Sequence, residues 1–198
     1  MYKRSDYMKD LYLMRHGETL FNIRRKIQGW CDSPLTENGI NQALMAKQKI
    51  KGISFDHYYS STAERSCDTL ELVAGDVNYK RLKGLKERNF GTFEGESEDL
   101  NPVWGNPDFT YDDLFPHYGG ELRADVSRRM KKTLTDIMNK DDHHCVLAVS
   151  HAGACAAFYS TVADYTTFRK EYGRLMNCDI LHFQFENDTF TFVELLRI

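Results

Sequence analysis

Apolar residues form two kinds of pattern along this chain: continuous runs, and runs that recur every three or four positions. Residues 11–14 and 145–150 are continuous apolar runs, which are typical of parallel strands buried on both faces of a sheet. We interpret residues 55–60 and 77–82 as two further strands. These stretches predict the strands of a central sheet.

Helical spacing of apolar residues predicts helices over residues 36–51, 62–74, 121–140 and 154–162. Thr36 is a candidate N-terminal cap for the first of them. The side chains expected to face the core from the first three helices are Ile40, Ala43, Leu44, Ile50, Ala63, Cys67, Leu70, Ala74, Leu122, Val126, Met130, Leu134 and Ile137.

The last part of the chain has the pattern of a β-hairpin. Residues 179–185 and 189–196 flank the turn-forming sequence Glu186-Asn187-Asp188. A terminal hairpin would place one strand at the edge of the sheet, where it could pair with a second copy of the chain. A homodimer is therefore one candidate partner arrangement, which the sequence alone does not decide.

Strands that alternate with helices predict an α/β fold, with a mostly parallel central sheet and helices on both faces. The length of 198 residues suits a single domain over residues 1–198. Residues 92–120 hold three of the four prolines and show no clear period. Because a loop this long in a compact domain is usually functional or disordered, we interpret it as a lid insertion over a site.

The composition excludes several classes of function. A net charge of −3 gives no electrostatic reason to expect a nucleic-acid or membrane partner, and we find no apolar run of 18 residues. The first residues do not resemble a secretion signal. Five cysteines, an odd number without a Cys-x-x-Cys pair, argue against a disulfide framework or a cysteine-based zinc site. We therefore expect a cytoplasmic protein.

Charged and imidazole side chains follow three of the predicted strands. Arg15 and His16 come directly after the first strand, Arg65 comes shortly after the second, and His151 follows the run 145–150. Ligands of α/β sheets bind beyond the carboxyl ends of the strands. Each residue alone also fits a polar strand cap or a surface charge, so the prediction depends on their convergence in space.

Two arginines and two histidines at one sheet edge suit phosphoryl transfer. Arginine offers paired donors that match phosphoryl oxygens, and a neutral histidine can act as a nucleophile. The charges of Arg15 and Arg65 should lower the pKa of His16 and so favour its neutral form. Glu87 is a candidate acid for the leaving oxygen, although alone it also fits a solvated side chain.

The residues around these positions resemble ordered sequence blocks of the histidine phosphatase superfamily, also called the phosphoglycerate mutase-like family. The matching segments are Arg15-His16-Gly17-Glu18-Thr19 with Asn22; Gln28-Gly29-Trp30 with Asp32, Pro34-Leu35-Thr36 and Gly39; Ser60-Ser61 with Arg65; Glu87 with Gly91 and Glu94-Gly95; Gly119-Gly120-Glu121; and Ser150-His151-Ala152-Gly153.

The resemblance implies a three-layer α/β/α sandwich, a phosphohistidine formed on His16, and Glu87 as the proton donor. It implies no metal and no cofactor, and a small-molecule phosphomonoester as the ligand. The residues it implies for binding the phosphoryl group or the substrate are Arg15, Asn22, Gln28, Gly29, Arg65, His151 and Ala152.

The residues of the predicted lid favour a phosphatase over a mutase. A mutase must hold an acceptor that carries a carboxylate and a phosphate, which calls for extra cations. Residues 92–120 contain no Lys or Arg, and their carboxylates should repel a bisphosphate unless they simply face solvent. Arg24, Arg25 and Lys26 oppose this reading if they hold a second anion rather than lying on the surface as ordinary charges.

We therefore predict hydrolysis of a small phosphorylated metabolite, with phosphoglycerate mutase as the first alternative. A non-catalytic module that binds a phosphorylated ligand is the second alternative. A cysteine-dependent phosphatase at Cys145 is excluded, because that chemistry needs an arginine six residues later and position 151 is a histidine.

Overall fold

The computed structural model describes residues 8–101 and 111–198. The strands that it contains are β1 (Lys9–Arg15), β2 (His57–Ser61), β3 (Tyr79–Leu82), β4 (Cys145–Ser150), β5 (Ile180–Glu186) and β6 (Thr189–Leu196). They form one sheet in the order β3-β2-β4-β1-β5-β6. Strands β3, β2, β4 and β1 pair in parallel, whereas β5 is antiparallel to both β1 and β6, so the predicted mostly parallel sheet is confirmed.

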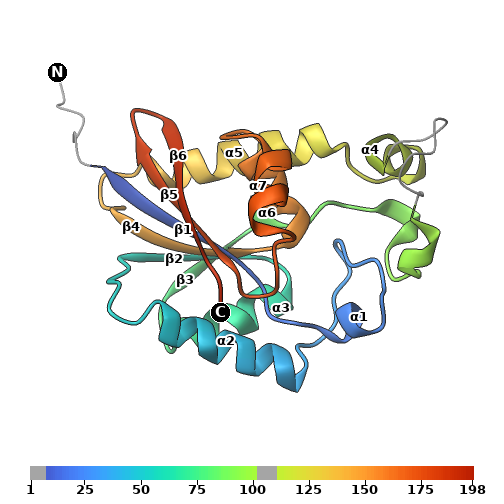
Figure 1. Cartoon of the computed structure of the whole chain (residues 1–198), viewed down its shortest axis with the longest axis horizontal. Helices are drawn as coiled ribbons and strands as arrows, with labels where there is room; N and C mark the ends of the chain where they lie inside the picture. The colour runs from blue at the N-terminus through green and yellow to red at the C-terminus, as the bar shows by residue number, and fades with distance from the viewer. Residues whose placement is uncertain (1–7, 102–110) are drawn as a thin grey trace.

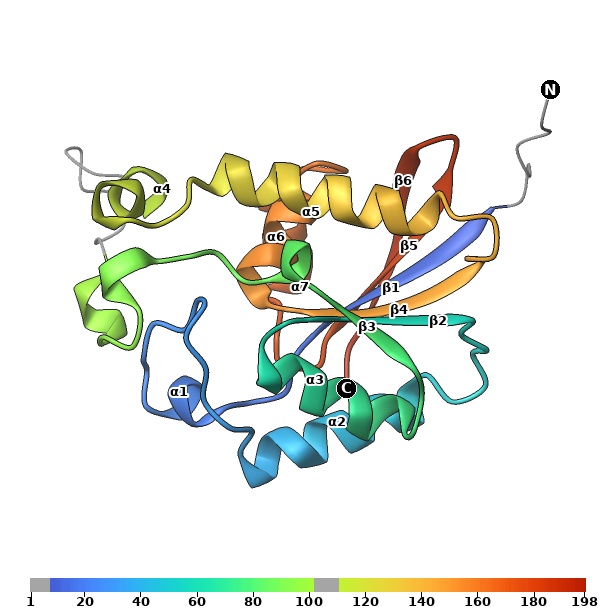
Figure 2. The same cartoon turned by 180° about the vertical axis from the view of Figure 1, so that it is seen from behind.

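Helices cover both faces of this sheet. The helices are α1 (Leu20–Ile23), α2 (Glu37–Lys49), α3 (Glu64–Ala74), α4 (Tyr111–Leu114), α5 (Arg123–Met138), α6 (Ala152–Tyr159) and α7 (Tyr165–Tyr172), with 3-10 turns η1 (Lys83–Leu85), η2 (Gly91–Phe93), η3 (Glu98–Leu100) and η4 (Phe115–Tyr118). Figures 1 and 2 show α2 and α3 below the sheet and α5, α6 and α7 above it. The α/β fold with helices on both faces is therefore confirmed.

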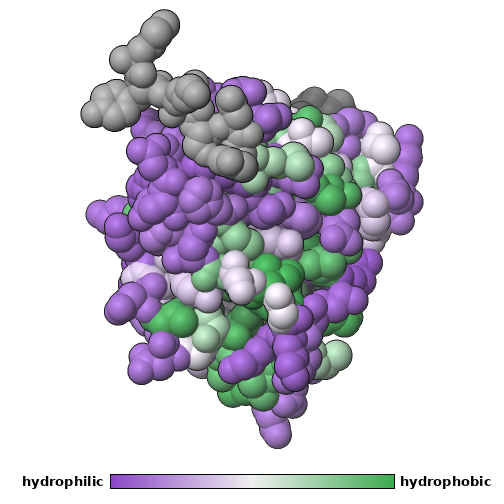
Figure 3. All heavy atoms as spheres, turned by 90° about the vertical axis from the view of Figure 1, so that its left-hand side faces the viewer, coloured by the Kyte–Doolittle hydropathy of each residue, from purple (hydrophilic) through white to green (hydrophobic). Residues whose placement is uncertain are grey.

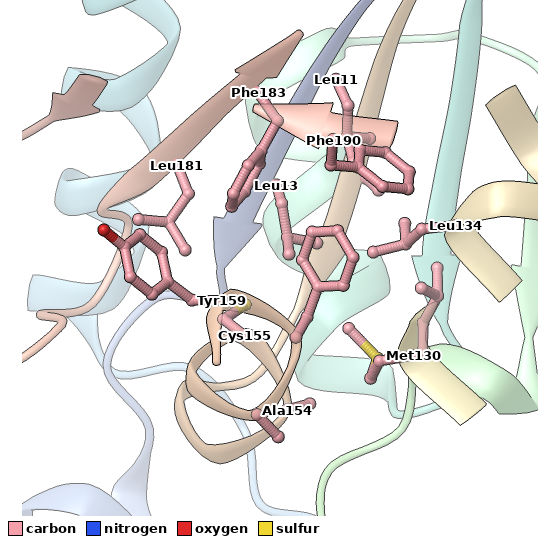
Figure 4. Packing of buried hydrophobic residues seen from close by; sticks show 14 of the residues in the cluster. Leu11, Leu13, Met130, Leu134, Ala154, Cys155, Tyr159, Leu181, Phe183 and Phe190 are labelled. Carbon is pink, nitrogen blue, oxygen red and sulfur yellow. The ribbon is translucent and has the colours of Figure 1, made fainter. Parts of the chain in front are cut away.

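Two hydrophobic cores lie on the two faces of the sheet. Side chains alternate along β1, so Leu11 and Leu13 enter the core under α5 and α6, while Tyr12 and Met14 enter the core over α2 and α3. Figure 4 shows the first core, where the side chain of Phe183 lies among those of its neighbours. This double burial explains why the central strands appear in the sequence as continuous apolar runs.

Some sequence predictions were wrong in detail. Ile40 and Leu44 of α2 are exposed, because this helix turns Ala43 and Ala46 toward the sheet instead. Leu122 is also exposed, since it precedes α5 rather than belonging to its buried stripe.

Three helices were not anticipated from the sequence, and one of them, α4, lies in the segment interpreted as a lid without a clear period. Helix α1 is a single turn capped by Thr19, and α7 is a short helix whose Phe168 is buried. The hairpin prediction holds, with positive φ angles at Asn187 and Asp188 in the turn. These three helices span only four residues in α1 and α4 and eight in α7, which leaves little length for a hydrophobic period.

The segment predicted as a lid packs against the loop that follows α1. The backbone N–H of Ile27 donates to the Glu96 carbonyl at 2.8 Å, and Gly95 N–H donates to the Ile27 carbonyl at 2.8 Å. Phe90 and Phe115 bury their rings against Ile27. Residues 102–110 of the predicted lid lie outside the described residues, so its role as a lid stays a prediction.

None of the helices within the described residues has the length and the apolar character needed to cross a membrane.

Candidate active site

The candidate site lies at the carboxyl ends of β1, β2 and β4. His16 follows the last residue of β1, Ser61 ends β2, and His151 follows β4 as the residue before α6. The His16 N–H donates to the Ser150 carbonyl at 3.0 Å, which ties the end of β1 to the end of β4. The two imidazole rings consequently lie with their centroids 5.2 Å apart.

Arg65 stands between the two histidines. It comes from the first turn of α3, and its side chain is fully buried. Its Nε donates to His16 Nε2 at 3.2 Å, and its Nη2 donates to His151 Nδ1 at 2.9 Å. The structure thus brings together three of the four residues that sequence reasoning expected to converge, the fourth being Arg15.

The same guanidinium also shapes the loop at residues 29–32. Its Nη2 donates to the Gly29 carbonyl at 2.8 Å and its Nη1 to the Cys31 carbonyl at 2.9 Å. Nη1 also pairs with Asp32 Oδ1 at 2.8 Å. A buried guanidinium needs such partners, and they fix its orientation toward the histidines.

His16 is held in one tautomer. Its Nδ1 lies 2.7 Å from the Gly17 carbonyl oxygen, which can only accept, so Nδ1 carries the proton and Nε2 keeps its lone pair. Burial, together with the charges of Arg65 and Arg15, lowers the pKa of His16 well below 6.5. A neutral, correctly oriented imidazole of this kind can act as a nucleophile.

His151 has the opposite tautomer. Its Nδ1 accepts from Arg65, so its Nε2 carries the proton and donates to Ser61 Oγ at 2.8 Å. Burial and the Arg65 charge lower the pKa of His151 well below 6.5. The ring therefore stays neutral while sharing the pocket with two arginines.

Arg15 carries an unused donor near these rings. Its Nη1 donates to the Leu175 carbonyl at 2.7 Å. Its Nε is buried and has no hydrogen-bond partner among the described residues. Burial lowers the pKa of Arg15, and an unsatisfied buried N–H of a guanidinium is a donor that an anionic ligand would satisfy.

Glu87 approaches the site from the segment after η1. Its Oε1 accepts from the Arg88 N–H at 2.8 Å and its Oε2 from the Gly153 N–H at 2.8 Å. A Cβ at Gly153 would lie 2.6 Å from Glu87 Oε1, so the carboxylate can take this position only beside a glycine. Glu87 is thereby fixed at the start of α6, by the N–H of the residue two positions after His151.

The remaining predicted residues lie in the surrounding loops. Asn22 Oδ1 accepts from the Thr19 N–H at 3.0 Å, and Gln28 Oε1 accepts from Thr19 Oγ1 at 2.7 Å. These two amides stabilise their own loop in this structure. Gly29 contributes its carbonyl to Arg65, and Ala152 is the first residue of α6.

Asn177 is a site residue that sequence reasoning missed. Its Nδ2 donates to the His16 carbonyl at 3.0 Å and lies 3.3 Å from Asn22 Oδ1. It precedes β5, whose antiparallel pairing brings its amino end beside the carboxyl end of β1. The predicted hairpin concerned only the pairing of β5 with β6, so the sequence held no signal for this contact, which depends on the pairing of β5 with β1.

The contact between Trp30 and Lys86 is a second feature of the site that sequence reasoning missed. The Trp30 indole N–H donates to the Glu87 carbonyl at 2.9 Å, and Lys86 Nζ lies 3.9 Å from the centre of the ring. Burial lowers the pKa of Lys86, and no carboxylate of the described residues forms an ion pair with it. Within the described residues, Lys86 therefore has no carboxylate at ion-pair distance, although the charge of Glu94 opposes part of the lowering of its pKa.

The charges around the predicted lid are largely paired. Arg25 Nη2 lies 2.8 Å from Asp99 Oδ1, and Arg88 Nη1 lies 3.1 Å from Asp112 Oδ1. Glu94 accepts from the Trp30 N–H at 2.7 Å and from the Cys31 N–H at 2.5 Å. These carboxylates thus organise loops and neutralise arginines rather than forming one repulsive surface.

Comparison of the sequence with known proteins shows which family the chain matches. The model of the histidine phosphatase superfamily (branch 1) matches residues 11–197. A probable phosphoglycerate mutase of Proteus mirabilis is 33% identical over 188 residues, which cover 91% of this chain and 86% of that protein.

Solved structures resemble the whole fold. The crystal structure of phosphoglycerate mutase from Bacillus anthracis superimposes with a TM-score of 0.82 at 25% identity, covering 98% of this chain and 95% of that one. Phosphoserine phosphatase from Entamoeba histolytica, in complex with 3-phosphoglyceric acid, gives a TM-score of 0.76 at 31% identity, covering 96% and 97%.

Proposed function

The chain belongs to the histidine phosphatase superfamily, and from that premise we propose that it hydrolyses phosphomonoesters through a phosphohistidine on His16. One observation carries the proposal. His16 is neutral, its Nδ1 proton is held by the Gly17 carbonyl, and its Nε2 lies 3.2 Å from the Arg65 guanidinium. The lone pair of a nucleophile and a donor for phosphoryl oxygens therefore meet at one point.

In this proposal, His16 Nε2 attacks phosphorus while the bond from phosphorus to the leaving oxygen breaks. Arg15 Nε, which has no partner among the described residues, donates to a phosphoryl oxygen, where negative charge is concentrated. Arg65 and His151 exchange their present hydrogen bonds, to the two imidazole rings and to Ser61, for bonds to the other phosphoryl oxygens. Protonated Glu87 gives its proton to the leaving oxygen. The ionised carboxylate then takes a proton from water as that water attacks the phosphohistidine, which releases phosphate and free His16.

The pairing of the surrounding cations supports water as the acceptor. A bisphosphate intermediate would need free cations for its second phosphate. Arg25 and Arg88 are already paired with Asp99 and Asp112. Asp99 and Asp112 therefore argue against a second phosphate at Arg25 and Arg88, while Lys86 forms no ion pair within the described residues.

Phosphoglycerate mutase is the second candidate activity. It is favoured by the names of two relatives, the probable mutase of Proteus mirabilis and the mutase of Bacillus anthracis. Both activities share the chemistry at His16 and differ only in the acceptor of the phosphoryl group.

The Lys86–Trp30 pair supports a phosphorylated substrate that also carries a carboxylate. Lys86 forms no ion pair within the described residues and directly precedes Glu87 in the chain, so an anionic group on the leaving portion of the substrate could bind to it. Trp30 would cover the carbon skeleton of such a molecule. The phosphoserine phosphatase of Entamoeba histolytica was crystallised with 3-phosphoglyceric acid, a compound of this class.

The test is phosphate release from a panel of phosphomonoesters in EDTA, run beside a 3-phosphoglycerate mutase assay. We expect release by the wild-type protein without mutase activity. Strong mutase activity with little phosphate release would indicate a phosphoglycerate mutase instead. If the protein shows neither activity, a non-catalytic module that binds a phosphorylated ligand is favoured.

His16→Ala should abolish turnover and leave the fold intact, because only the nucleophile is lost. The matched control is His144→Ala, which changes an exposed histidine at the far end of the sheet. An acid-labile phosphoprotein should form in the wild type and be missing in His16→Ala. Unchanged hydrolysis by His16→Ala would refute the mechanism.

A further inference from the structure

A second cluster of chemically active side chains lies at the opposite end of the sheet. His57 opens β2, and Asp142 and His143 lie just before β4. Because β2 and β4 are parallel neighbours, their amino ends lie side by side, away from the carboxyl ends that hold His16. This end is on the left in Figure 1 and faces the viewer in Figure 3, where it shows both hydrophilic and hydrophobic surface.

The three side chains converge on a single point. His143 Nδ1 lies 2.7 Å from Asp142 Oδ1, and His57 Nε2 lies 3.2 Å from Asp142 Oδ2. One ligand atom from each residue lies within 4.8 Å of the other two. Ligand atoms that bind one zinc ion at about 2.0–2.2 Å are themselves roughly 3–4 Å apart, so this spacing is close to that of a metal site.

We propose that His57, Asp142 and His143 bind one divalent transition-metal ion, of which Zn²⁺ is the test case. Two imidazoles and one carboxylate suit Zn²⁺, Cu²⁺ or Ni²⁺, whereas Mg²⁺ and Ca²⁺ prefer sites built of oxygen atoms. The site is separate from the proposed chemistry at His16, which uses no metal.

His143 is the fixed ligand of this cluster. Its ring is buried, and its Nε2 lies 2.7 Å from the Tyr59 hydroxyl, which also accepts from Lys140 Nζ at 2.8 Å. With a metal on Nδ1, the ring proton would reside on Nε2 and be donated to Tyr59. Such an outer hydrogen bond is what orients metal-binding histidines. The Lys140 charge lies on the Nε2 side of the ring, away from the proposed ion.

His57 and Asp142 are the adjustable ligands. Their side chains are 33% and 72% exposed, so both can move by the small amount that binding requires. The His57 ring is stacked on His143 with a centroid separation of 3.5 Å, and it must turn about its side-chain bonds to point its lone pair at a shared ion. The exposed side leaves room for water to complete the coordination.

Binding would join two segments that are distant in sequence. The ion would tie the start of β2 to the loop between α5 and β4, a connection present only in the folded chain. A ligand that binds the folded state alone raises the free energy of unfolding. The structure therefore predicts stabilisation by the metal without a requirement for it in turnover.

The test uses the full chain, stripped with EDTA and dialysed free of chelator. Zn²⁺ is titrated into wild type, His57→Gln and Asp142→Asn by calorimetry, with the melting temperature measured in parallel. His144→Gln is the matched control, since this exposed histidine is adjacent to the cluster but not part of it. Co²⁺ in place of Zn²⁺ reports the ligand set through its visible absorption.

We expect one ion per chain with micromolar affinity, and a rise in melting temperature. Affinity should fall by about tenfold or more in His57→Gln and Asp142→Asn and stay unchanged in His144→Gln. Equal binding by all four proteins would place the ion elsewhere, for instance on His16 and His151, and overturn the proposal. No binding in the micromolar range by the wild type would overturn it as well.

Discussion

At the scale of single residues, burial decides the protonation state of the two histidines in the candidate active site. His16 and His151 are buried beside Arg65, and both desolvation and its positive charge oppose the imidazolium form. Each ring then uses its single proton in a different direction, toward Gly17 in one case and Ser61 in the other. The lone pairs of both rings consequently face Arg65.

Glu87→Gln separates general acid catalysis from binding. The amide cannot give a proton to the leaving oxygen, so substrates with poor leaving groups should slow by about 10²–10⁴-fold. Nitrophenyl phosphate needs little protonation and should slow far less. The check is kcat for both kinds of substrate, and equal slowing of the two would remove Glu87 from the acid role.

Lys86→Gln should reduce selectivity for carboxylate-bearing substrates. A hydrogen bond to a charged partner is worth about 1.5–3 kcal/mol, which corresponds to about 10- to 100-fold. The ratio of kcat/KM for 3-phosphoglycerate over glycerol 3-phosphate should fall by that factor, because the two differ in the carboxylate. Lys83→Gln, an exposed lysine in the same segment, is the control. A ratio that stays constant in Lys86→Gln would contradict the assignment.

At the scale of elements, the start of α6 positions the proposed acid. The Gly153 N–H is one of the free donors of the first helical turn, and it donates to Glu87 Oε2. Glu87 belongs to the segment between β3 and the predicted lid, far from α6 in sequence. The helix start thus links the acid to the His151 that precedes it.

Gly153→Ala tests this link. Its Cβ would lie 2.6 Å from Glu87 Oε1, and the flexible carboxylate must move away. Activity should fall about 10-fold or more, while stability should hold or rise by up to about 1 kcal/mol, because alanine is the better helix former. Urea denaturation and phosphate release on one preparation check both quantities. Retained activity would show that the position of Glu87 is not critical.

The segment between α7 and β5 is a second positioning element. The buried Asp179 carboxylate pairs with Arg197 Nη2 at 2.8 Å and accepts from the Met176 N–H at 2.7 Å. The segment held in this way presents the Leu175 carbonyl to Arg15 and the Asn177 amide to the His16 carbonyl. An ion pair between the buried Asp179 carboxylate and the partly exposed Arg197 guanidinium thus supports the loop that orients Arg15.

At the scale of the whole molecule, the sheet separates two sites by the length of its strands. The candidate active site occupies the carboxyl ends, and the proposed metal cluster occupies the amino ends of β2 and β4. Strand β6 forms one edge of the sheet. The homodimer that the hairpin suggested and the cytoplasmic location stay predictions.

The buried histidines also make global stability depend on pH. In the unfolded chain both pKa values return to about 6.5, whereas in the folded protein they lie well below it. Below pH 6.5 the unfolded state therefore binds more protons, and each histidine lowers the free energy of unfolding by about 1.4 kcal/mol per pH unit until its folded-state pKa is reached.

Urea denaturation of wild type, His151→Gln and His144→Gln above and below pH 6.5 checks this dependence. The pH slope should be shallower in His151→Gln, which lacks one buried imidazole, and unchanged in His144→Gln. Identical slopes in all three proteins would show that His151 does not contribute.

The sequence by itself determined the order of the main elements and the residues that end the central strands. Continuous apolar runs identify strands buried on both faces, and polar residues directly after them must lie at the carboxyl edge of a parallel sheet. The positions of His16 and His151 could be predicted in this way because they depend on local pattern and strand direction, and Arg65 could be predicted because it lies in the first turn of the helix after β2. Their convergence depends on the strand order β2-β4-β1, which only the tertiary structure decided.

Only the tertiary structure decided the directions of the individual hydrogen bonds and the pairing of charges between distant segments. The bonds from Arg65 to the two histidines, the bond between Gly153 and Glu87, the Asn177 contact and the neutralisation of Arg25 and Arg88 all join residues brought together by folding. No periodicity in the chain encodes such contacts, because they depend on how segments from different layers meet around the end of the sheet.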